Sequence, residues 1–136
     1  MRFFITSENH TTIADKVRSV RNSIGQKISK MAEMKDYGQS VSYWGHISIV
    51  NPSSVYDKGF YPEVKKYSGS KKEVELRLKI DYDDVVNGDE KKLYTLFTDS
   101  ILRGVHIAES ELKIDDFDFK RFRADLNELF SKEGWL

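Results

Sequence analysis

Apolar residues recur every three or four positions early in the chain, which predicts one long amphipathic helix. We expect this helix to start at Thr11 or Thr12, either of which can cap it, and to run to about Met34. Gly38 follows soon after, and glycine commonly supplies the left-handed residue that ends a helix. The helix would bury a single stripe formed by Ile13, Val17, Val20, Ile24, Ile28 and Met31.

The same period returns in the last third of the chain, where it predicts two further helices. The first spans roughly residues 89–109, and the second begins with Asp116 or Asp118 as its N-cap. The apolar stripe of the first consists of Leu93, Leu96, Phe97, Ile101, Val105 and Ala108. That of the second consists of Phe119, Phe122, Leu126, Leu129 and Phe130.

Elsewhere the alternation of apolar and polar residues is typical of β-strands. Residues 2–6 and 41–50 are two strand candidates. Residues 60–67 and 73–80 flank a Ser-Gly-Ser loop and predict a hairpin. Because proline cannot donate to a strand ladder, Pro62 suggests that the first arm lies at a sheet edge.

The predicted elements follow one another as β-α-β-β-β-α-α. Strands grouped in the middle of the chain favour an α+β fold, in which an antiparallel sheet of about four strands is covered by about three helices. No linker, repeat or low-complexity tract interrupts the chain, so we expect residues 1–136 to form a single domain.

Composition narrows the class of protein. Hydrophobic residues make up 39% and charged residues 32% of the 136 residues, as in globular domains rather than disordered chains. The absence of cysteine excludes disulfides and thiolate metal sites, and it suits a reducing compartment. No apolar stretch approaches the roughly 18 residues of a membrane span, and no signal-peptide pattern is present. We therefore expect a cytoplasmic protein that does not contact membranes.

A formal net charge of zero hides a strong segregation of charge along the chain. Residues 1–80 carry 14 Lys and Arg against 8 Asp and Glu, whereas residues 81–136 carry 8 against 14. The acidic excess is concentrated in two runs, residues 81–90 and 109–118. Separated charge steers partners rather than building folds, which indicates a binding protein.

Catalytic motifs are missing from the sequence. It contains no phosphate-binding loop, no G-x-S-x-G and no H-E-x-x-H, and nothing in the spacing joins His10, His46 and His106. We predict no catalytic residue and no cofactor, while an enzyme site assembled from scattered residues stays open. Oxygen ligands for Mg²⁺ or Ca²⁺ are present at residues 115–118, but capping of the following helix explains these acids more simply, so no metal is predicted.

Basic residues off the apolar stripe of the first helix leave a nucleic-acid-binding alternative open. A nucleic-acid module normally carries a larger positive excess, and no aromatic residue lies within this helix to stack on bases. The simpler interpretation is a solvated helix face. The basic residues concerned are Lys16, Arg18, Arg21, Lys27 and Lys30.

The second half of the chain combines three elements in a fixed order. A strand, Val74-Glu-Leu-Arg-Leu-Lys-Ile80, enters the acidic turn Asp81-Tyr-Asp-Asp84, and a long helix follows. A terminal pattern of the form F-D-x-x-x-F-x-x-D-L then begins at Phe117-Asp118. With this arrangement, about residues 74–130 resemble immunity proteins of bacterial polymorphic-toxin and contact-dependent growth inhibition systems.

This resemblance implies a cytoplasmic, non-enzymatic protein that binds a cognate toxin domain, for which a nuclease is one candidate, and blocks its active site or substrate surface. An acidic surface would complement the positive cleft of such a nuclease. An interaction module with another partner is the remaining alternative. The predicted partner-binding residues are Asp81, Tyr82, Asp83, Asp84, Glu109, Glu111, Asp115, Asp116 and Asp118.

Overall fold

The structure is a computed structural model that describes seven segments of the chain. Their ranges are residues 3–8, 14–38, 41–50, 61–66, 72–81, 87–111 and 117–136. Side chains are described for residues 17–38, 87–110 and 117–136.

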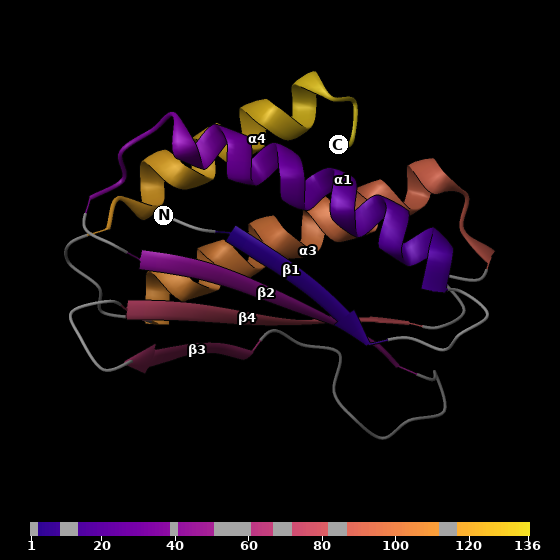
Figure 1. Cartoon of the computed structure of the whole chain (residues 1–136), viewed down its shortest axis with the longest axis horizontal. Helices are drawn as coiled ribbons and strands as arrows, with labels where there is room; N and C mark the ends of the chain where they lie inside the picture. Colours follow the sequence, from indigo (N-terminus) through magenta and orange to yellow (C-terminus); the bar gives the residue numbers. More distant parts are fainter. Residues whose placement is uncertain are drawn as a thin grey trace.

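Three helices and four strands make up most of the described backbone (Figure 1). The helices are α1 (Ala14–Glu33), α3 (Glu90–Glu111) and α4 (Phe119–Lys132). The strands are β1 (Phe3–Glu8), β2 (Val41–Val50), β3 (Tyr61–Lys66) and β4 (Lys72–Asp81).

The strands form one sheet in the order β1-β2-β4-β3. β1 pairs with β2 in parallel, and β2 pairs with β4 in parallel. β3 pairs with β4 in the antiparallel direction, with Tyr61 opposite Arg77 and Lys66 opposite Lys72. α1 provides the crossover that a parallel β1–β2 pair requires. β3 lies at the sheet edge, where a proline is tolerated.

These findings correct the predicted fold class. The antiparallel sheet is wrong, because two of the three strand pairings are parallel. The α+β description also fails for the part of the chain whose side chains are described, which is mostly helical and contains no strand. Alternating residues predict that a segment is extended, but the direction of its neighbour depends on the path of the chain between them.

A helical core lies against one face of this sheet. α1 contacts β1, α3 contacts β3 and β4, and α1 and α3 contact each other, which places both helices on the same face. α4 folds back along α3, so that α3 and α4 run in opposite directions (Figure 1). No helix among the described residues combines the length and the hydrophobicity that a bilayer span requires.

The predicted apolar stripes account for most of the described core, to which Ala32, Tyr37, Phe117 and Trp135 also belong. α1 contributes Val17, Val20, Ile24 and Ile28; α3 contributes Leu93, Phe97, Ile101, Val105 and Ala108; α4 contributes Phe119, Phe122, Leu126 and Phe130. Each of these side chains is buried. Met31, Leu96 and Leu129 are half-buried at the margin of the same cluster. Among the described side chains, the 3.6-residue period therefore predicted the inward faces of all three helices correctly, and Ile13 lies outside them.

Two glycines give a matched pair of stability predictions. Gly25 lies inside α1, and a Cβ built there meets nothing within 4 Å. Gly25→Ala should therefore raise the free energy of unfolding by about 0.5–1 kcal/mol, because alanine has the higher helix propensity. Gly134 has a φ of +75°, so Gly134→Ala should lower it by about 1–2 kcal/mol. Urea denaturation would measure both, and a Gly25→Ala variant less stable than the wild type would contradict the first.

Candidate functional site

The structure describes the predicted partner-binding residues unevenly. Glu109, near the end of α3, and Asp118, just before α4, have described side chains. Asp81 is the last residue of β4 and Glu111 the last of α3, and only their backbone is described. The other predicted residues lie outside the described part of the chain; they are Tyr82, Asp83, Asp84, Asp115 and Asp116.

The two acidic runs are separated by the length of α3. Asp81 ends β4 on the side of the molecule where α3 begins, whereas Glu109 lies near the opposite end of that helix (Figure 1). With a rise of about 1.5 Å per residue, Glu90 and Glu109 are about 30 Å apart along the axis. Of the predicted contact acids, Asp81 and Glu109 therefore lie toward opposite ends of α3.

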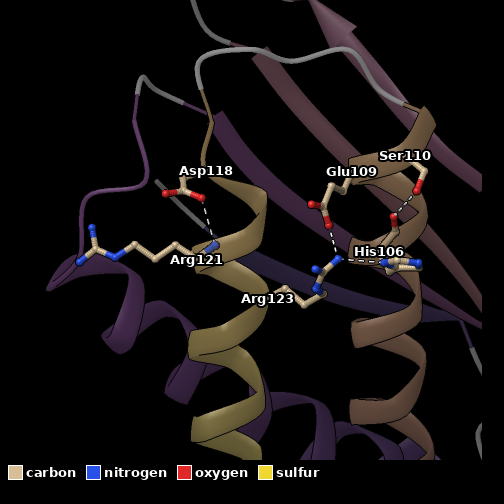
Figure 2. Close-up of polar contacts among 6 residues, drawn as sticks. All are labelled: His106, Glu109, Ser110, Asp118, Arg121 and Arg123. Atoms are coloured by element: carbon tan, nitrogen blue, oxygen red, sulfur yellow. Dashed lines mark hydrogen bonds and ion pairs between the residues drawn. The ribbon is translucent and has the colours of Figure 1, made fainter.

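Arg123 connects α4 to the end of α3 (Figure 2). Its Nη1 atom forms an ion pair with Glu109 and lies 2.9 Å from Nδ1 of His106. Because a guanidinium is always a donor, Nδ1 takes the acceptor role in this contact. The Arg123 and Glu109 side chains are 30% and 31% exposed, so the pair lies at the edge of the core.

Asp118 caps the N-terminus of α4. Its Oδ1 accepts a hydrogen bond of 3.0 Å from the backbone N–H of Arg121 (Figure 2). This bond satisfies one of the free N–H groups at the helix start, and the carboxylate complements the helix dipole. One of the two N-caps that the sequence allowed is thus confirmed, and the Asp118 carboxylate is already occupied within the protein.

Tyr37 lies shortly after the end of α1 and contacts the start of α4. Its side chain is 3% exposed, and its ring packs against Phe117 and Phe122 at centroid distances of 5.9 and 5.2 Å. The hydroxyl donates a 2.8 Å hydrogen bond to Oδ2 of Asp125, and the carbonyl accepts one of 2.7 Å from the Asp118 N–H. Sequence analysis missed this role, because Tyr37 stands between two turn-forming residues and outside any apolar stripe.

The environment of Tyr37 makes stability sensitive to high pH. Burial, followed by the hydrogen bond and negative charge of Asp125, raises the pKa of Tyr37, while Arg121 acts in the opposite direction. In the unfolded chain this group ionises near pH 10. Since the folded protein holds the proton more tightly, the contribution of Tyr37 to stability is present below about pH 10 and is lost as the pH rises beyond it.

Tyr37→Phe tests this link. At neutral pH we expect the free energy of unfolding to fall by about 1–2 kcal/mol, because the bond to the Asp125 carboxylate is lost. Between about pH 10 and 11.5 the variant should lose stability less steeply than the wild type. Urea denaturation across this range would measure both effects, with Tyr94→Phe as a control that keeps its aromatic ring. Equal slopes in the variant and the wild type would contradict the prediction.

Two lysines, one on α1 and one just after it, form ion pairs with an acidic residue of α4 or with the residue that follows α4. Lys27 Nζ lies 3.2 Å from a carboxylate oxygen of Glu133, and Lys35 Nζ lies 3.9 Å from one of Asp125. Such partly exposed pairs contribute little to stability, but they reduce the positive potential that a nucleic acid would meet. The side chain of Lys16 is outside the described residues. Nucleic-acid binding through this helix gains no support from these contacts.

The histidines are not brought together by any described contact. His106 is held by Arg123, His46 lies on β2 with only its backbone described, and His10 is outside the described residues. Within residues 17–38, 87–110 and 117–136, no three His, Asp or Glu side chains are grouped as metal ligands.

Comparison with known proteins identifies the family that the chain matches. The model of the family described as Immunity protein 44 matches residues 1–132, which include every helix described here. The comparisons with curated proteins and with solved structures returned no match.

Proposed function

Because the chain belongs to the immunity protein 44 family, we propose that it binds a cognate toxin domain and neutralises it by covering the toxin's active site or substrate surface. The observation that carries this proposal is the match to an immunity-protein family over residues 1–132 of 136. Neutralisation by occlusion needs a complementary surface rather than a catalytic group. The protein would act in the cytoplasm of the cell that it protects.

The charge distribution of this chain favours a toxin with a basic surface, such as the cleft of a nuclease. The acidic excess of residues 81–136 would complement it, speed association and select against wrong partners. The proposed contact residues remain Asp81, Tyr82, Asp83, Asp84, Glu109, Glu111, Asp115, Asp116 and Asp118. Among them, Tyr82 is the aromatic residue, and aromatic residues are enriched among the side chains that dominate binding energy.

The separation of Asp81 from Glu109 limits how the toxin can dock. A standard interface buries about 800 Å² of each partner, which corresponds to a patch about 30 Å across. This is close to the distance between the two ends of α3. A toxin centred on α3 could reach both Asp81 and Glu109, whereas a toxin centred on either end of the helix would reach one of them.

Affinity purification of the tagged protein from its native cells tests the proposal. We expect a stoichiometric toxin C-terminal domain, identified by mass spectrometry, and we expect co-expression with this protein to restore the growth of cells that produce the toxin. An unrelated tagged protein of similar charge is the control. Recovery of nucleic acid, or of no partner, would contradict the proposal.

A further inference from the structure

The contact between Arg123 and Glu109 lies close to the connection between α3 and α4. Glu109 is two residues before the end of α3, and Arg123 is the fifth residue of α4. The chain between these helices includes residues 112–116, which carry two of the proposed contact acids, Asp115 and Asp116. The contact therefore holds the end of α3 against the start of α4, on either side of this connection.

One guanidinium group holds two side chains of α3. His106 and Glu109 are three residues apart and so lie on the same face of the helix, and Nη1 of Arg123 reaches both (Figure 2). Planar, permanently charged and rich in donors, arginine suits such a shared contact better than lysine does. The start of α4 is held independently by the Asp118 cap and by the Asp118 N–H bond to Tyr37.

The ion pair also changes what Glu109 can offer to a partner. Its carboxylate faces a positive charge of its own protein, so the two charges largely cancel at a distance. A basic toxin residue would have to separate this pair before it could use Glu109, and an ion left without its partner in an interface is costly. Glu109 thus differs from a free contact charge.

We propose that Glu109 and Arg123 are a positioning pair of the toxin-binding surface, and that Glu109 supports binding through Arg123 rather than by touching the toxin. This inference rests on the proposed function. It removes Glu109 from the set of contact charges and assigns Arg123, which sequence analysis had not singled out, to the same surface.

A charge swap separates positioning from contact. Glu109→Gln breaks the ion pair at nearly constant side-chain size, and Arg123→Gln breaks it with a shorter, uncharged side chain. The double variant Glu109→Arg/Arg123→Glu rebuilds the pair in reverse and leaves the net charge unchanged. It also places the cation at the C-terminal end of α3 and the anion nearer the N-terminal end of α4, as both helix dipoles prefer. His106 can switch tautomer and donate to the new carboxylate.

Binding kinetics with the toxin domain recovered by affinity purification, in a catalytically inactive form, give the first readout. We expect each single variant to raise the dissociation rate about fivefold, because a less ordered surface binds less tightly. The swap should bring it back to within about twofold of the wild type. The association rate and its salt dependence should change little in the swap, since a neutralised pair does not steer the toxin.

Two outcomes would overturn the inference while leaving the proposed function intact. A swap variant that associates more slowly, with a weaker salt dependence, would show that Glu109 is a contact charge. Single variants with an unchanged dissociation rate would show that the pair positions nothing. A wild-type protein that binds no toxin would instead contradict the proposed function.

Amide hydrogen exchange of the free protein tests the pair without any toxin. Exchange in the last turn of α3 and the first turn of α4 should become about fivefold faster in Arg123→Gln, and the swap should restore it. Arg103→Gln is a matched control, because it removes an exposed arginine that pairs with Asp99 within α3. Unchanged exchange in Arg123→Gln, or an equal effect in the control, would refute the positioning role.

Discussion

Phe122→Ala should lower the free energy of unfolding by about 3–5 kcal/mol, which is the usual cost of removing a buried phenylalanine. Phe122 is fully buried in α4. Its ring meets those of Tyr37 and Phe117 edge to face, at centroid distances of 5.2 and 5.6 Å. Truncation would therefore leave a cavity where the segment after α1 meets the segment that begins α4, and neighbouring rings cannot close it fully.

Urea denaturation would measure this loss as a lower midpoint with an unchanged slope. Asn127→Ala is the matched control, because Asn127 lies on the same helix at an exposed position. It should change stability by no more than about 0.5 kcal/mol. A loss below about 1 kcal/mol for Phe122→Ala would show that this aromatic cluster does not support the fold. Because stability totals only about 5–15 kcal/mol in such domains, the variant should also be scarce in cells.

Reversing the charge of Asp115 and Asp116 together should slow association with the toxin about tenfold or more at low salt. Each substitution by lysine removes an attraction and adds a repulsion if the toxin presents a basic cleft, and long-range charge acts mainly on the association rate. The difference from the wild type should shrink as salt is raised, because exposed charges are screened. Stopped-flow or surface-based kinetics at two salt concentrations would measure both effects.

The control for this experiment reverses the same number of charges elsewhere. Asp99→Lys/Glu128→Lys changes two exposed carboxylates within α3 and α4, outside both acidic runs. We expect a much smaller effect on the association rate. An equal effect would mean that the total charge of the protein, and not a defined surface, governs association. Unchanged kinetics in the Asp115 and Asp116 variant would exclude this run as a contact surface, even if the toxin still binds.

Local chemistry was sufficient to predict the three helices, while the expected caps of the first, Thr11 and Thr12, lie outside the described residues. The apolar period placed the first helix at Thr11 or Thr12 to about Met34 and the second at 89–109, against Ala14–Glu33 and Glu90–Glu111 in the structure. It also selected the residues that each helix buries, and Asp118 was one of two expected caps. These features depend on side chains within a few residues of one another, which is why a single sequence contains them.

The direction of the strands and the polar contacts between helices were decided only by the tertiary structure. Parallel pairing of β1, β2 and β4 depends on how distant segments return to the sheet. The bond from Tyr37 to Asp125 joins residues 88 positions apart, and Arg123 meets Glu109 because α4 folds back along α3. In the sequence, Glu109 is one acid in an acidic run. Its pairing with Arg123 appears only when two helix faces meet, because a charge acts on whatever lies near it in space.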